Sequence, residues 1–92
     1  MSQYTLSNSA KEDLKRIYDY GFYNFGEARA DKYFLKLFNQ FDQIVKQPLL
    51  FSAVDYIRPN YRRCVCGVDS IYYLIDKTEI KIVRIIRSQD FK

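Results

Sequence analysis

Histidine and tryptophan are absent from this chain of 92 residues, and cysteine, glycine and proline are scarce, with two, three and two residues respectively. Without histidine the chain lacks the commonest acid–base group near neutral pH, the usual partner of a serine or cysteine nucleophile, and the usual nitrogen ligand of zinc. Three scattered glycines also cannot form a glycine-rich phosphate-binding loop. We therefore expect no catalytic residues of a conventional kind, no metal site and no cofactor.

Long apolar runs are missing too. No stretch approaches the ~18 apolar residues that a membrane-spanning helix needs, and Met1–Thr5 lacks the charged and apolar pattern of a secretory signal. Cys64 and Cys66 are two residues apart on a predicted strand, so their side chains leave the same face and are poorly placed for a disulfide. We expect a cytoplasmic protein with buried, inert thiols and no contact with membranes.

Aromatic residues, in contrast, are abundant. Nine tyrosines and seven phenylalanines give an aromatic share of 17%, within an apolar share of 48%. This composition excludes an intrinsically disordered chain. The length suits one modest hydrophobic core, so we expect residues 1–92 to form a single domain.

Positive charge is concentrated in the second half of the chain. Residues 1–56 contain seven Lys/Arg and seven Asp/Glu, whereas residues 57–92 contain eight and four, so the whole net charge of +4 lies in the second segment. Such an excess points to nucleic acid, a nucleic-acid-bound protein or an acidic protein as a partner. Proteins that bind DNA on their own have denser basic clusters, so we expect contact with DNA only through another protein.

Helical periodicity dominates the first half. Ser7 and Ser9 compete as the N-cap of a first helix, which Gly26 ends. The apolar face of this helix contains Ala10, Leu14, Ile17, Tyr18 and Phe25, and the solvent face contains Lys11, Asp13, Lys15 and Asp19. A second helix runs from about Glu27 to Lys46, with apolar residues at helical spacing over five turns. Because only a glycine corner separates the two helices, we expect an antiparallel hairpin.

The second half predicts a small sheet. The expected strands are Gln3–Leu6, Tyr61–Cys66, Ser70–Ile75 and Ile80–Arg87, and Pro48–Asn60 is an irregular crossing segment. Short turns join the last three strands, which indicates an antiparallel meander, with the first strand beside the last. The predicted fold class is therefore α+β, with the helical hairpin covering one face of the sheet.

The last strand sets Arg84 and Arg87 into an apolar run, and both charges need water or an anionic partner. Basic residues also begin the first strand of the meander. The candidate target-binding residues are Arg62, Arg63, Arg84, Arg87, Asp90 and Phe91. A ribonuclease without histidine could use arginine and tyrosine to stabilise a scissile phosphate, but we favour solvent exposure or partner contact for these residues.

A two-helix hairpin covers only one face of such a sheet. In the last strand, Val83 and Ile85 share one face, and Ile80, Ile82 and Ile86 share the other. We expect the second apolar face to be covered by another chain, with candidate partner residues Tyr72, Leu74, Ile80 and Ile82.

Three segments, in this order, carry a family resemblance: YTLSNSAKEDLKRIYDYGFYNFGEARADKYFLKLF, YRRCVCG and VDSIYYLIDKTEIKIVRIIRSQD. They resemble the ParE branch of the RelE/ParE toxin superfamily, nearly from end to end. The resemblance implies a RelE/ParE-like fold and a toxin that inhibits DNA gyrase, blocks replication and serves plasmid or chromosome stabilisation. It also implies a ParD-like antitoxin that forms a heteromeric complex with the toxin and wraps it with a flexible C-terminal segment.

The sibling RelE branch cleaves messenger RNA on the ribosome, with basic strand residues and a histidine or tyrosine near the C-terminus. Arg63 and Arg87 lie roughly where two such groups would fall, but Ser88–Lys92 contains neither tyrosine nor histidine. This difference favours a non-enzymatic, gyrase-binding toxin. A ribosome-dependent endoribonuclease is the alternative, and a toxin-fold protein that has lost activity is a third possibility.

Overall fold

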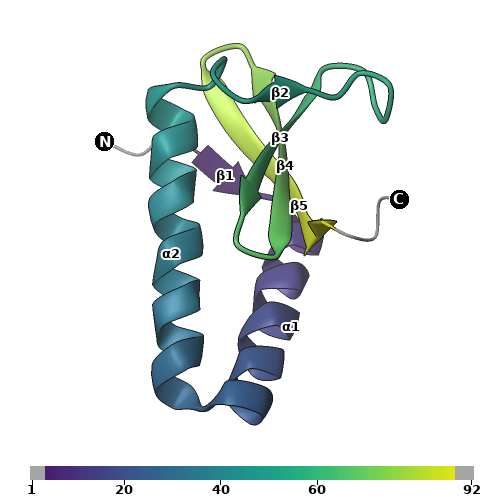
Figure 1. Ribbon diagram of the computed structural model, residues 1–92. Helices are drawn as coiled ribbons and strands as arrows, with labels where there is room; N and C mark the ends of the chain where they lie inside the picture. The colour runs from purple at the N-terminus through teal and green to yellow at the C-terminus, as the bar shows by residue number, and fades with distance from the viewer. Residues whose placement is uncertain (1–3, 89–92) are drawn as a thin grey trace.

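The computed structural model describes residues 4–88. Its elements are β1 (Tyr4–Leu6), α1 (Asn8–Phe25), α2 (Glu27–Lys46), β2 (Ser52–Ala53), β3 (Tyr61–Cys66), β4 (Asp69–Asp76) and β5 (Glu79–Arg87). The strands form one sheet in the order β1-β5-β4-β3-β2, in which only the β1–β5 pair is parallel. The helices form an antiparallel hairpin that packs on the sheet and projects beyond it (Figure 1). The α+β prediction is confirmed, and neither helix is long and apolar enough to cross a membrane.

Ser7 determines where α1 begins. Its hydroxyl accepts a hydrogen bond from the backbone N–H of Ala10 at 3.0 Å and donates one to the carbonyl of Val83 at 2.8 Å. The same side chain therefore caps the helix and attaches its first turn to β5. Ser9, the competing candidate, lies exposed inside the helix. At the other end Gly26 has a φ of 93°, a conformation that glycine adopts readily, and it separates α1 from α2 as predicted.

The core lies between the hairpin and the sheet. Each layer contributes large apolar side chains that are almost fully buried. They include Ala10 and Leu14 of α1, Leu37, Phe41 and Ile44 of α2, and Cys64, Ile71, Tyr73, Ile80, Ile82 and Ile85 of the sheet. This packing matches the periodic apolar face expected for the second helix. The helices reach past the sheet, so their far ends have no core to enter (Figure 1).

A β-bulge in β5 changes the facing of its side chains. Tyr72 pairs with Arg84 while the next residue, Tyr73, pairs with Ile82, so Val83 is an extra residue in the strand. As a result Ile82 and Ile85, three residues apart, both enter the core. The expectation that Ile85 and Ile82 lie on opposite faces is therefore wrong, because strict alternation stops at the bulge.

The sheet has five strands instead of the four expected. The segment Pro48–Asn60 contains β2, whose two residues pair with Arg62 and Arg63 at the start of β3. A strand of two residues has no detectable alternation of apolar and polar side chains, so the sequence pattern could not reveal it. The other strands agree with the predicted ranges to within one residue at each described end.

Candidate functional site

Asp13 joins α1 to the edge of β5 at the point where β1 has ended. Asp13 is only 5% exposed, and its carboxylate accepts hydrogen bonds from Arg84 Nε at 2.7 Å and Nη2 at 3.1 Å, from the Ile85 N–H at 2.9 Å, and from Arg16 Nη2 at 3.3 Å. Burial by itself raises the pKa of the Asp13 carboxyl, but these donors outweigh it and hold the pKa below its usual range. The expected place of Asp13 on the solvent face is wrong, because the edge N–H of Ile85 needs an acceptor there.

Arg62, Arg84 and Arg87 each contact another part of the chain. Arg84 binds Asp13, although its side chain remains 49% exposed. Arg62 donates to the carbonyl of Phe51 at 2.7 Å and so holds the segment before β3. Arg87 lies 5.8 Å from the centre of the Tyr20 ring of α1.

The four arginines consequently do not form one cluster. Arg87 is three residues from Arg84, beyond the bulge, so the two side chains leave opposite faces of β5. Arg63 and Arg84 lie on either side of Tyr72 in the strand register, and both leave their strands on the face away from the helices, although the Arg84 guanidinium reaches Asp13 of α1. Asp90 and Phe91 lie outside the described residues.

The predicted partner-binding residues of the sheet are less accessible than expected. Ile80 and Ile82 are buried in the core beneath the helices, so the expectation that they belong to an uncovered face is wrong. Tyr72 and Leu74 do lie on the other face, but Tyr72 is also buried and Leu74 is partly buried. An uncovered apolar surface must therefore be sought elsewhere on the molecule.

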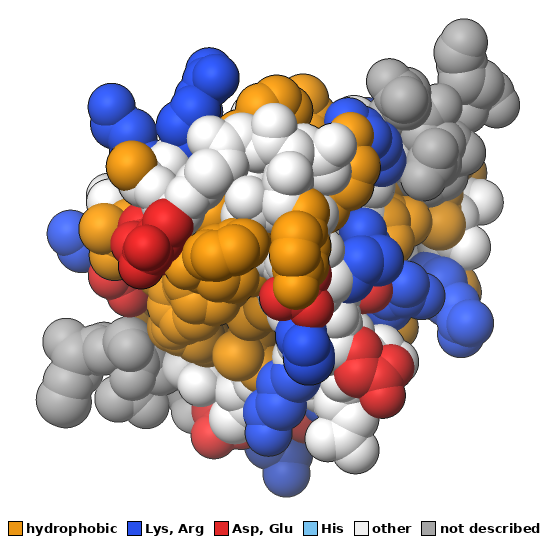
Figure 2. Space-filling view, turned by 90° about the horizontal axis from the view of Figure 1, so that it is seen from below, with side chains coloured by type: hydrophobic (Ala, Val, Ile, Leu, Met, Phe, Trp, Pro, Cys, Tyr) orange, Lys and Arg blue, Asp and Glu red, His pale blue; other side chains and the backbone are white. Residues whose placement is uncertain are grey.

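That surface lies on the hairpin. Large apolar side chains are exposed along it, up to 82% for Tyr23, and the others are Tyr20, Phe22, Phe25 and Leu35. The view onto the hairpin end shows apolar side chains gathered in one broad patch with charged side chains around it (Figure 2). Exposed apolar patches of this kind mark interaction sites. Phe25, which the sequence places on the apolar face of the first helix, is 55% exposed because α1 has already passed the sheet at this residue.

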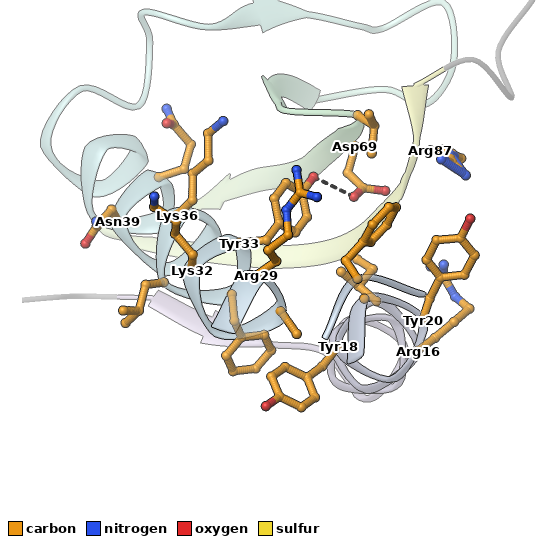
Figure 3. A pocket seen from close by; sticks show the side chains of 18 residues that line it. Arg16, Tyr18, Tyr20, Arg29, Lys32, Tyr33, Lys36, Asn39, Asp69 and Arg87 are labelled. Carbon is orange, nitrogen blue, oxygen red and sulfur yellow. Dashed lines mark hydrogen bonds between the residues drawn. The ribbon is translucent and has the colours of Figure 1, made fainter. Parts of the chain in front are cut away.

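A groove of about 910 Å³ opens between the two helices and the β3–β4 turn. Its walls are apolar in the middle and basic at the rim, and its basic side chains are Arg16, Arg29, Lys32, Lys36 and Arg87. In the close view Arg16, Tyr20 and Arg87 lie on one side and Lys32, Lys36 and Asn39 on the other (Figure 3). Among the residues that line the groove, only Asp69 is acidic. The groove thus combines an apolar floor with positive charge.

Tyr33 closes the sheet end of this groove. Its hydroxyl donates to Asp69 Oδ2, at 2.7 Å, and lies 2.9 Å from the carbonyl of Cys66 (Figure 3). Burial, followed by the bond to Asp69, raises the pKa of Tyr33. Gly67 lies beneath the ring with a φ of 61°, and a Cβ there would come within 2.6 Å of Tyr33 Cε1. The turn and the ring therefore fit each other closely, and the Asp69 carboxylate is engaged by the protein itself.

The described residues offer little reactive chemistry. Cys64 and Cys66 are buried, as predicted, and burial raises the pKa of Cys64 to about 11, which disfavours the nucleophilic thiolate. Within residues 4–88 no three His, Cys, Asp or Glu side chains come together in a way that could hold a metal ion. The arrangement is suited to binding a macromolecule through the groove and the strand ends.

Residues 4–90 match the family described as "ParE toxin of type II toxin-antitoxin system, parDE". The chain belongs to the ParE toxin family. It is 29% identical to Toxin ParE1 of Mycobacterium tuberculosis over 89 residues, which cover 96% of this chain and 91% of that protein. It is also 29% identical to Toxin ParE1 of Caulobacter vibrioides over 86 residues, covering 94% and 88%.

Two solved structures share the fold. A chain of the "Chromosomal ParDE TA system from P. aeruginosa" superposes with a TM-score of 0.82 and 22% identity, covering 95% of this chain and 96% of that chain. A conserved hypothetical protein from Helicobacter pylori gives a TM-score of 0.57 at 16% identity, covering 97% of each chain. Membership of the ParE family and the RelE/ParE-like α+β fold are thus confirmed.

Proposed function

We propose that this ParE-family toxin acts in the cytoplasm by binding DNA gyrase and blocking replication, without catalysis, and that a ParD-like antitoxin neutralises it in a heteromeric complex. The observation that carries the proposal is the family match over residues 4–90. The chemistry of the described residues supports a binding mode of action. They contain no histidine, and their two cysteine thiols are buried.

The groove on the hairpin is the proposed antitoxin-binding surface. Its apolar middle would be covered by the antitoxin, and its basic rim attracts an acidic segment. This assignment replaces the sheet residues Ile80 and Ile82, which are buried. Arg87 belongs to this surface because it lines the groove beside Tyr20.

The opposite face of the sheet is the proposed gyrase-binding surface. Arg63 lies on it, Arg84 leaves β5 on this face and stays 49% exposed although Asp13 holds its guanidinium, and the chain continues past Ser88 to Asp90 and Phe91, which we include in the contact. The contact with DNA would then be made by gyrase or the antitoxin.

The test is inducible expression, with and without the antitoxin gene that is expected beside the toxin gene. We expect growth arrest, induction of the DNA-damage response and intact reporter messenger by primer extension. Purified toxin should inhibit supercoiling by purified gyrase. Arg63→Ala should reduce both effects about tenfold or more, whereas Lys11→Ala, at matched expression, should leave them unchanged.

Other results would overturn the proposal. Discrete messenger cuts that require ribosomes would make the protein an endoribonuclease of RelE type. Normal growth without antitoxin, at verified expression of folded protein, would identify a chain that keeps the toxin fold and has lost toxicity. Equal effects of Arg63→Ala and Lys11→Ala would remove the proposed gyrase-binding surface.

A further inference from the structure

Three basic residues form a row along α2 at the edge of the groove. Arg29, Lys32 and Lys36 are spaced by three and four residues, so they follow one side of the helix. All three are exposed, and all three line the groove. At the rise of an α-helix the row extends about 10 Å from its first to its last residue.

The row is unfavourable for the helix that carries it. Like charges three or four residues apart destabilise a helix, and no acidic residue of α2 lies three or four positions from any member of the row. Within residues 4–88 no carboxylate forms a salt bridge with Arg29, Lys32 or Lys36. Because this spacing of basic residues opposes helix stability and lies next to an apolar groove, it indicates a role in binding.

The opposite wall of the groove differs from this row. Its Arg16 already donates to Asp13 at 3.3 Å and to the carbonyl of Ile85 at 3.1 Å. Its Arg87 lies over the ring of Tyr20, and in the row itself Arg29 lies 5.4 Å from the centre of the Phe25 ring. In the close view the side chains of Lys32 and Lys36 stand apart from these groups, across the groove (Figure 3). Among the described residues, Lys32 and Lys36 therefore bring positive charge to the α2 wall without an acidic partner.

We propose that the row Arg29–Lys32–Lys36 determines which partner the groove accepts. The partner segment is an amphipathic helix whose apolar face fills the groove and whose flank toward α2 carries acidic residues three, four and seven positions apart. Acidic residues seven positions apart on that helix span about 10 Å, the length of the row. The inference rests on the proposed function, because it names the chemistry of the antitoxin segment at that surface.

Two synthetic helical peptides of about 18 residues, roughly 27 Å long, test this proposal. Both have the same composition and the same apolar stripe. One carries three Glu residues along one flank of the stripe, and the other carries them on the side opposite the stripe. Binding to the purified full-length chain is measured by fluorescence anisotropy. We expect the flank peptide to bind about tenfold or more tightly than the other, with an advantage that falls as salt rises.

Charge reversal adds a second measurement. Lys32→Glu with Lys36→Glu should weaken binding of the flank peptide about tenfold or more, and a flank peptide with Lys in place of Glu should bind this variant and not the wild type. The matched control is Lys11→Glu with Lys81→Glu, which makes the same change in net charge at exposed residues outside the groove lining. Circular dichroism checks that both variants are folded.

Equal binding of the two peptides, or no recovery with the charge-swapped peptide, would overturn the proposal. Such a result is distinguishable from failure of the proposed function. If the chain arrests growth and the antitoxin restores it, but the chain does not discriminate between the peptides, the proposed function stands and the proposed role of the row is wrong. If the chain discriminates between the peptides but does not arrest growth, the proposed role of the row stands and the proposed toxicity is wrong.

Discussion

The junction of α1 with β5 and the groove between α1 and α2 use charged residues in opposite ways. At the junction, Asp13 is buried and its carboxylate accepts four hydrogen bonds from three residues. In the groove, the basic side chains of α2 have no acidic partner among the described residues, and aromatic rings are exposed beside them. Charges at the junction therefore hold the fold together, whereas the basic side chains of α2 in the groove are available to another molecule.

The same contrast exists between the two α-helices. Lys15 and Asp19 of α1 form a salt bridge at 2.8 Å with the favourable spacing of four residues, whereas α2 repeats positive charge at that spacing. If stability alone had shaped both helices, both would show complementary pairs. The difference teaches that unfavourable charge spacing, seen beside an exposed apolar surface, is a better guide to function than the amount of charge.

The largest expected effect is at the junction. Asp13→Ala removes the acceptor of the Ile85 N–H and of the Arg84 guanidinium, and should lower the free energy of unfolding by about 3 kcal/mol. Urea unfolding followed by circular dichroism measures this difference. Asp19→Ala is the matched control, since its ion pair with Lys15 is exposed, and it should cost less than about 0.5 kcal/mol.

The pH dependence of the same pair of proteins sharpens this test. The pKa of Asp13 is lower in the folded chain than its ordinary value, so its contribution to stability is complete above about pH 4 and disappears as the pH falls through the folded pKa. The difference between wild type and Asp13→Ala should therefore shrink below pH 4. A difference that stays constant would mean that Asp13 stabilises the fold by packing alone.

A smaller effect is expected at the start of α1. Ser7→Ala removes the N-cap and the bond to the Val83 carbonyl, and should destabilise the protein by about 1–2 kcal/mol in the same measurement. Ser9→Ala changes an exposed residue inside the first turn and should alter stability by less than about 0.5 kcal/mol. Equal losses for both serines would contradict the assignment of Ser7 as the cap.

The smallest effect has the opposite sign. Lys32→Glu replaces two like-charge neighbours with two complementary ones, with Glu four residues before Lys36, and should raise the free energy of unfolding by about 0.5 kcal/mol. Thermal unfolding at low salt is the measurement, and the gain should fade at high salt. A destabilised variant would mean that Lys32 already has a stabilising role in the isolated chain.

Most of the fold could be predicted from the sequence because its main elements carry strong local signals. The apolar spacing of α2, the glycine corner at Gly26 and the short turns between strands each act over a few residues, so periodicity and turn chemistry are enough. The candidate site is harder to predict from the sequence. The sequence indicates the four arginines as candidate contact residues, but the faces that Arg84 and Arg87 take relative to Ile80 and Ile82 depend on the bulge at Val83, which no local pattern reveals.

The environments of two residues, Asp13 and Phe25, differ from the predicted ones for the same reason. Helical spacing alone predicts that Asp13 lies on the solvent face of α1 and Phe25 on its apolar face. The true environment of each depends on how far the sheet extends beside the helix: β5 reaches Asp13 and does not reach Phe25. The sequence shows the row on α2 as a repeat of basic residues with no acidic residue of the helix three or four positions away, and that signal points to the groove.

The extra residue in β5 has a consequence for comparisons among relatives. With Val83 accommodated in the bulge, Ile82 and Ile85 face the core; a strand one residue shorter, lacking this position and running regularly, would give those isoleucines the same facing. Homologous chains can therefore differ in length by one at this point and still present equivalent side chains to either side. An alignment gap opposite Val83 would leave the architecture intact.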